Sequence, residues 1–192
     1  MEETCIYHER QRLQFCLLHA LNNLLQVTCS CFLIFLFQKK DSFTRAELDG
    51  IAEKLLHEDP KEGSWTPLSV IFKPHHNTFT GNYDVNVLIA ALEARSYRIV
   101  WHDHRNSASS INISTDSLLG IMLNIPIRRY AGLWRSRHWA ALRRIGGHWY
   151  NLDSDLPAPK PFQNLDEVTE FLDDIMALGG EVLIVFYDKL CK

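Results

Sequence analysis

The chain has 192 residues, of which 46% are hydrophobic and 22% charged, and its formal net charge is −3 at pH 7. This length and composition predict a single globular domain over residues 1–192, large enough to bury a hydrophobic core. A chain without an excess of positive charge has no electrostatic basis for binding nucleic acid, so no nucleic-acid partner is expected.

The cysteines bear on the cellular environment. There are five, an odd number, and no two of them form a Cys-x-x-Cys pair. This pattern argues against a disulfide framework and against a four-thiolate zinc site. Because no N-terminal signal peptide is recognisable either, we expect a reducing, cytoplasmic location. The five positions are Cys5, Cys16, Cys29, Cys31 and Cys191.

The first predicted helix begins at Cys16, because the leucines that follow recur at the spacing of one buried helix face. A thiol at a helix N-terminus lies near unpaired backbone N–H groups and the positive end of the helix dipole, which favour the thiolate form. Gln11, five residues upstream, could aim its amide at the oxygen of a carbonyl under attack. The alternative is that Cys16 serves only as a small buried hydrophobic residue.

Residues 27–38 form an atypical apolar run, VTCSCFLIFLFQ. The run is shorter than the roughly 20 residues that span a bilayer, so we expect no stable membrane association. An extension of the preceding helix and a membrane anchor over residues 27–37 remain alternatives. Our hypothesis is that this apolar insert is not part of the natural fold. Val codons begin with GT and Phe37-Gln38 can be encoded by TTT-CAG, which match the two ends of an intron.

The middle of the chain alternates helix and loop signals. Residues 44–47, Thr-Arg-Ala-Glu, form a capping box that opens a helix, and Asp59-Pro60 ends it. Residues 57–80 have no clean period and contain three prolines, which predicts a flexible arm or loop. A second helix is predicted from Val85 to Arg95, and a strand follows over residues 97–101.

The last third of the chain is mostly strands. Gly146-Gly147 indicates a hairpin turn between two alternating segments, and Asn164 is the predicted N-cap of a final helix. Helices first and strands later favour an α+β fold over a βαβ repeat. The predicted strands are residues 120–125, ending at Pro126, then 138–143, 148–153 and 181–187, with the helix over residues 165–178.

The hairpin brings two polar residues together. His138 lies eight residues before Gly146 and Asp153 six after Gly147, so they become neighbours at its open end. Cross-strand neighbours have Cβ atoms about 4.5–5.5 Å apart, which lets a carboxylate accept from a histidine nitrogen while the other nitrogen faces a thiol. The alternatives are a structural sheet histidine and a turn-forming aspartate.

Other histidines suggest metal binding only weakly. His102-Asp103-His104 and His75-His76 have no third ligand at the spacing of a metal site, so no metal is expected.

Several sequence blocks follow one another along the chain: YHERQ at 7–11, HALNN at 19–23, FTR at 43–45, GNYDVNV at 81–87, RHW at 137–139 and YNLDS at 150–154. In this order the blocks together resemble the Josephin domain family, and most closely the short Josephin proteins, which are cysteine deubiquitinases.

This resemblance implies a papain-like fold, with N-terminal helices packed on a mostly antiparallel sheet. It implies Cys16 as nucleophile, His138 as general base, Asp153 as the residue that orients the base, and Gln11 as oxyanion donor. The implied reaction is cleavage after the C-terminal glycine of ubiquitin, without a cofactor. The family's helical arm would fall within residues 42–80. The alternative is a catalytically weak or inactive ubiquitin-binding module.

The resemblance also implies the partners, which are ubiquitin or polyubiquitin chains and ubiquitinated proteins. Without residues 27–38, Gln26 joins Lys39 and restores the short polar turn that the family pattern has there.

Overall fold

The computed structural model describes residues 5–11, 15–26, 42–58, 76–77, 82–129 and 134–188. Within these residues the fold is α+β, with four α-helices and a six-stranded antiparallel sheet, as the sequence predicts. The helices are α1 (Cys16–Leu25), α2 (Arg45–Glu58), α3 (Val85–Glu93) and α4 (Leu165–Ala177), with a short 3-10 helix, η2 (Ala108–Ser110). The strands are β1 (His76–Asn77), β2 (Asn82–Tyr83), β3 (Tyr97–Trp101), β4 (Leu118–Arg129), β5 (Trp134–Ile145), β6 (His148–Asn151), β7 (Lys160–Pro161) and β8 (Glu181–Tyr187).

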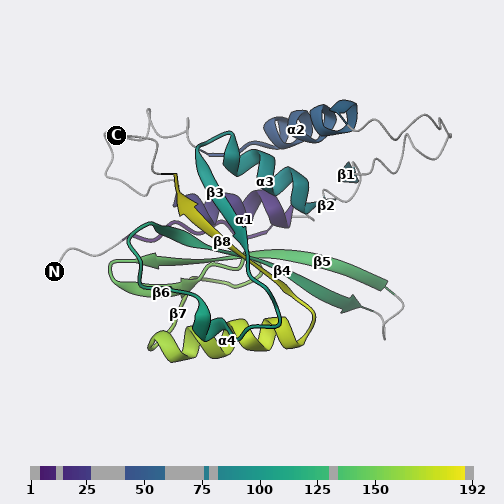
Figure 1. Ribbon diagram of the computed structural model, residues 1–192. Coiled ribbons are helices and arrows are strands. Elements are labelled where there is room, and N and C mark those ends of the chain that lie inside the picture. Colours follow the sequence, from purple (N-terminus) through teal and green to yellow (C-terminus); the bar gives the residue numbers. More distant parts are fainter. Residues whose placement is uncertain are drawn as a thin grey trace.

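The main sheet has the strand order β3-β8-β4-β5-β6-β7, and every neighbouring pair is antiparallel. Its long central strands are β4 and β5, while β8, the last strand of the chain, lies between β3 and β4 (Figure 1). Strands β1 and β2 form a separate two-stranded ladder.

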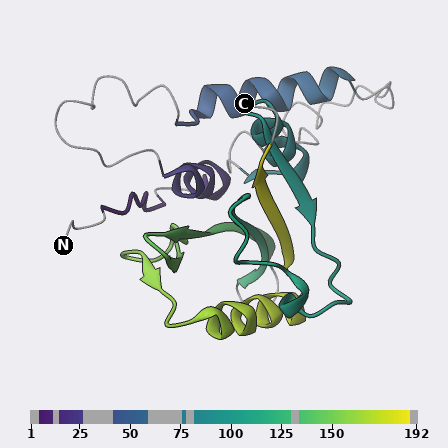
Figure 2. The same cartoon turned by 60° about the vertical axis from the view of Figure 1, so that its left-hand side comes forward.

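Helices cover both faces of the sheet. α1 and α3 lie on one face with α2 beyond them, and α4 lies on the other face together with η2 (Figures 1 and 2). The alternation of β5 explains this arrangement, because Trp139 and Ala141 belong to the core beneath α1, whereas Ala140 and Leu142 belong to the core above α4. The sheet is therefore buried on both sides at β5, and α1 packs against one of these buried faces.

The structure contains the helix caps and the hairpin turn that the sequence predicts. The capping box is formed, because the Glu47 carboxylate accepts from the Thr44 N–H at 2.7 Å and the Thr44 hydroxyl accepts from the Glu47 N–H at 3.2 Å. Asn164 caps α4 through the Glu167 N–H. Gly146 and Gly147 have φ of 56° and 88° and close the β5–β6 hairpin in two residues.

The prediction that a strand ends at Pro126 is wrong. β4 continues to Arg129, and Pro126 stands opposite Arg137 of β5. Pairing between β4 and β8 ends at Asn124, so beyond this point β4 has a neighbour on one side only among the described strands. A proline without an N–H is tolerated at such an edge.

Two predictions fall largely outside the described residues. The apolar insert, residues 27–38, is outside them, and α1 ends before it because Gln26 has the left-handed φ of 51°. Of residues 57–80, the first two end α2 and residues 76–77 form β1, while the rest are not described. No helix in the described ranges is long and apolar enough to traverse a bilayer.

Candidate active site

Cys16 is the first residue of α1 and is 4% exposed. The preceding residue, Phe15, provides no side-chain capping bond, so the positive end of the helix faces the thiol without a competing cap. Among the described residues, Cys16 is a free cysteine whereas Cys5 is disulfide-bonded. The disulfide at Cys5 differs from the expectation that the odd cysteine count suggested.

The structure brings His138 to both Cys16 and Asp153. Nε2 of His138 lies 2.6 Å from Oδ1 of Asp153, and the Cys16 thiol lies close enough to the imidazole to raise its pKa. Because Asp153 occupies Nε2, the nitrogen left for the sulfur is Nδ1. Asp153 follows the end of β6 by two residues, so it meets His138 diagonally and not directly across the hairpin. The hairpin spacing predicted this proximity.

The surroundings of His138 favour its charged form. Burial alone would lower its pKa, since the side chain is almost fully enclosed, but the hydrogen bonds to Asp153 and Cys16 and the charges of both outweigh burial. The net effect raises the pKa of His138 from 6.5 to about 10. A protonated imidazole next to a sulfur stabilises negative charge on that sulfur.

Asp155 is a second carboxylate beside His138 that sequence reasoning missed. Its Oδ2 lies 3.9 Å from His138 Nε2, and its backbone N–H donates to Asp153 Oδ1 at 3.0 Å. In the described part of the chain, His138, Asp153 and Asp155 are also the group whose ligand atoms have metal-site spacing, within 4.8 Å of one another. The His138–Asp153 hydrogen bond accounts for the central contact in this group without a metal.

Gln11 is joined to the group through the residue after Asp153. The Gln11 N–H donates to the Ser154 carbonyl at 2.9 Å, and the Ser154 hydroxyl donates to Gln11 Oε1 at 3.3 Å. His8 Nε2 lies 3.0 Å from the carbonyl oxygen of Asp153. Within the described residues, the structure thus links Gln11 to Asp153 and His138 by way of Ser154, and not by a direct bond to Cys16.

Two buried asparagines of α1 hold these segments together, and sequence reasoning assigned them no role. Asn23 is fully buried; its Nδ2 donates to the carbonyls of Glu9 at 3.1 Å and Leu152 at 2.9 Å, and its Oδ1 accepts from the Glu9 N–H at 2.6 Å. Asn22 exchanges two hydrogen bonds with the backbone of Phe43. Polar residues on the buried face of a predicted helix were the available signal.

The N-terminal segment is fixed along α1 by charge as well. The Glu9 carboxylate lies 2.7 Å from His19 Nδ1 and also accepts from Asn22 and from the Tyr7 hydroxyl. Burial would raise the pKa of Glu9, but these hydrogen bonds outweigh it and lower the pKa below its usual value. The Gln26 side chain pairs with both the N–H and the carbonyl of Tyr7. Residues 7–11 therefore run beside α1.

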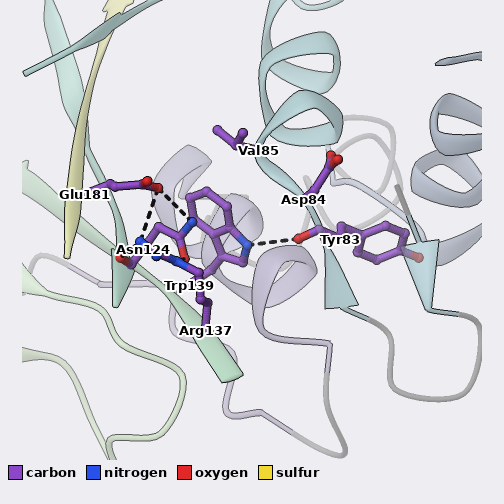
Figure 3. A pocket seen from close by; sticks show the side chains of 7 residues that line it. All are labelled: Tyr83, Asp84, Val85, Asn124, Arg137, Trp139 and Glu181. Carbon is purple, nitrogen blue, oxygen red and sulfur yellow. Dashed lines mark hydrogen bonds and ion pairs between the residues drawn. The ribbon is translucent and has the colours of Figure 1, made fainter. Parts of the chain in front are cut away.

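A cavity of about 290 Å³ lies on the face of β5 that carries Arg137 and Trp139, the two neighbours of His138 (Figure 3). The indole N–H of Trp139 donates to the Tyr83 carbonyl at 3.1 Å, and Arg137 lies 3.2 Å from Glu181. The cavity thus combines an apolar indole with an ion pair. Its lining residues are Tyr83, Asp84, Val85, Asn124, Arg137, Trp139 and Glu181.

Comparisons with known proteins match one family over most of the chain. The Josephin family profile matches residues 11–186. A Josephin-like protein of Arabidopsis thaliana is 58% identical over 177 residues, which cover 92% of this chain but 46% of that protein, so the chain spans about half of its length. Human Josephin-2 is 38% identical over 186 residues, covering 94% of this chain and 85% of its own. An ataxin-3 homolog of Arabidopsis thaliana is 25% identical over 182 residues, covering 94% of this chain and 58% of its own.

Proposed function

This chain belongs to the Josephin family, and from that premise we propose that it is a cysteine-type deubiquitinase. It hydrolyses the peptide or isopeptide bond after the C-terminal glycine of ubiquitin. The observation that carries the proposal is the contact series Cys16–His138–Asp153 at the N-terminus of α1, with the pKa of His138 raised to about 10. A thiol, a charged imidazole and an orienting carboxylate are the parts of a thiol protease.

In the proposed mechanism the Cys16 thiolate attacks the carbonyl carbon of the C-terminal glycine. The Gln11 amide donates to the oxyanion that forms, and His138 gives its proton to the leaving amine as the C–N bond breaks. This leaves a thioester between Cys16 and ubiquitin. Water then attacks the thioester with His138 as base, releasing the ubiquitin carboxylate and regenerating the thiolate–imidazolium pair. Asp153 holds the imidazole in place throughout, and the chemistry needs no cofactor.

The cavity lined by Arg137 and Trp139 includes none of Cys16, His138 and Asp153 in its lining, so we assign it no part in binding the substrate. The partners are then ubiquitin or polyubiquitin chains and ubiquitinated proteins. A single catalytic domain over residues 1–192 and a cytoplasmic location are parts of the same proposal.

An active-site probe tests the function. The wild-type chain and the Cys16→Ala variant are incubated with ubiquitin that carries an electrophile at its C-terminus. The expected result is a covalent adduct that increases the mass by one ubiquitin in the wild type and is absent in Cys16→Ala. A chain that binds ubiquitin without any adduct would instead be the non-catalytic ubiquitin-binding module.

A further inference from the structure

Two adjacent residues make side-chain contacts with two different parts of the proposed machinery. Asp153 bonds the imidazole of His138, and Ser154 donates its hydroxyl to Oε1 of Gln11 at 3.3 Å. Ser154 is 2% exposed, and its carbonyl also accepts from the Gln11 N–H at 2.9 Å. Gln11 is therefore held by both the main chain and the side chain of the residue that follows the orienting carboxylate.

We propose that Ser154 is a positioning residue that orients the side-chain amide of Gln11 for the oxyanion. The inference rests on the proposed function, in which Gln11 is the oxyanion donor. An amide side chain has one end that donates, Nε2, and one end that accepts, Oε1. Because the Ser154 hydroxyl donates to Oε1, the Nε2 end is left to donate to the reaction.

The direction of this hydrogen bond determines the sign of the effect. A serine hydroxyl can donate or accept, so the amide could also turn round and donate Nε2 to Ser154. In that orientation Ser154 would compete with the oxyanion, and its removal would leave activity unchanged or increase it. In the proposed orientation its removal lowers activity.

Ser154→Ala isolates the hydroxyl. The main-chain bond between Gln11 and Ser154 does not depend on the side chain, so the two segments stay together in the variant. The change removes one oxygen atom from a buried site and leaves Asp153 intact. Ser107→Ala is a matched control, because Ser107 also donates a hydroxyl to a side chain, that of Asp173, but lies in the turn that caps η2.

The experiment measures kcat and KM on ubiquitin with a fluorogenic amide at its C-terminus. We expect Ser154→Ala to lower kcat about tenfold with KM unchanged, and Gln11→Ala to lower kcat by about 10²–10³, the usual cost of an oxyanion donor. The double variant should be no slower than Gln11→Ala, because Ser154 acts through Gln11. Ser154→Thr keeps the hydroxyl and should restore most of the activity, and Ser107→Ala should match the wild type.

A second readout separates positioning from folding. Ubiquitin aldehyde forms a tetrahedral adduct with an oxyanion on Cys16, whereas iodoacetamide alkylates the thiol without one. In Ser154→Ala the aldehyde should bind about tenfold more weakly while the alkylation rate stays at the wild-type value. A loss of folded protein would lower both.

The outcomes distinguish the two proposals. If the wild type leaves fluorogenic ubiquitin uncleaved, both the proposed function and this inference are overturned. If the wild type cleaves it and Ser154→Ala is as fast or faster, only the inference is overturned. Equal slowing by Ser154→Ala in the wild-type and Gln11→Ala backgrounds also overturns it, because Ser154 would then act independently of Gln11.

Discussion

His138 faces three groups that can carry negative charge: Cys16, Asp153 at 2.6 Å and Asp155 at 3.9 Å. Of the two carboxylates, that of Asp153 lies within hydrogen-bond distance of His138 Nε2, so we expect Asp153 to orient the ring. Asp155 is half-exposed, and solvent weakens its effect.

Replacement of Asp153 by asparagine should cost less activity than removal of His138. The asparagine carbonyl oxygen can still accept from Nε2, whereas no described neighbour replaces the base. We expect kcat/KM to fall about tenfold in Asp153→Asn and about 10³-fold in His138→Ala, within the usual range for a general base. Steady-state cleavage of fluorogenic ubiquitin provides the comparison, and equal losses would contradict the prediction.

The pH dependence should report the raised pKa of His138. The folded-state pKa, about 10, lies above the unfolded value of 6.5, so protonation of His138 favours the fold. This contribution is fully present below pH 6.5 and is lost as the pH rises through about 10. The difference in free energy of unfolding between the wild type and Asp153→Asn should therefore shrink between pH 6.5 and 10. Urea titrations at several pH values measure this difference, and a difference that grows as the pH rises would contradict the prediction.

The candidate site residues predicted from the sequence are those for which a local pattern, such as a helix start or a hairpin length, predicts a position. Cys16 was found from the start of a helix, and His138 with Asp153 from the length of a hairpin. Asn23 and Ser154 were not assigned roles because their partners lie 129 and 143 residues away, and no local pattern names a distant partner. Their roles depend on which segments the fold brings together.

Helix α1 sits close to β4 because Gly120 has no side chain. A Cβ at this position would lie 2.6 Å from Cδ1 of Leu24 and 2.5 Å from the carbonyl oxygen of Leu142. Gly120→Ala should therefore destabilise the fold by about 1–3 kcal/mol, as overpacking does. Gly50→Ala is the control, since a Cβ there meets nothing within 4 Å, and in α2 it should stabilise by about 0.5–1 kcal/mol. Thermal unfolding measures both, and similar melting temperatures would contradict the account.

The attachment of α1 to its neighbours depends on Asn23. Asn23→Leu keeps the size of the side chain but leaves the Glu9 N–H and the Leu152 carbonyl without their present partner. Each unsatisfied buried group costs about 1–3 kcal/mol, so the variant should lose at least about 2 kcal/mol. Asn86→Ala, at an exposed site on α3, should change stability by less than about 0.5 kcal/mol. Urea unfolding compares them, and equal midpoints would rule out the role given to Asn23.

Elements with strong local signals were predictable, and those defined by their neighbours were not. A capping box at Thr44, the N-cap Asn164 and a two-glycine turn fix α2, α4 and the β5–β6 hairpin within a few residues. The short strands β1 and β7 each have two residues and exist only through pairing with β2 and β6. β4 continues past Pro126 because its pairing with β8 ends at Asn124 and no longer needs the N–H that proline lacks. The sequence of β4 alone does not contain this information about its neighbour.

Across the whole chain, the two ends of the apolar insert lead to positions that are close in space. Asn22, in the last turns of α1, bonds both backbone groups of Phe43, so Phe43 is held beside the helix that ends just before Gln26. Joining Gln26 to Lys39 leaves five peptide steps to Phe43, which reach about 16 Å. We therefore expect the chain without residues 27–38 to close on the same fold.

Deletion of residues 27–38 should preserve cleavage of fluorogenic ubiquitin within about twofold and reduce aggregation, since it removes an apolar run. Size-exclusion chromatography and kinetics of the deletion variant provide the measurement. An unfolded variant would show that the fold requires the insert. In the source organism, a peptide that crosses Gln26–Lys39 would show the shorter chain directly by mass spectrometry, whereas peptides confined to the longer form would refute the hypothesis.

The position of β8 has a consequence for synthesis on the ribosome. The strand that separates β3 from β4 is the last of the sheet to be translated, although both of its neighbours precede it by many residues (Figure 1). Until it emerges, β3 and β4 each expose an open edge, and the layer that supports His138 is in two parts. The nascent chain thus carries Cys16, His138 and Asp153 before their supporting sheet is complete, and the sheet can close only when translation has passed residue 187.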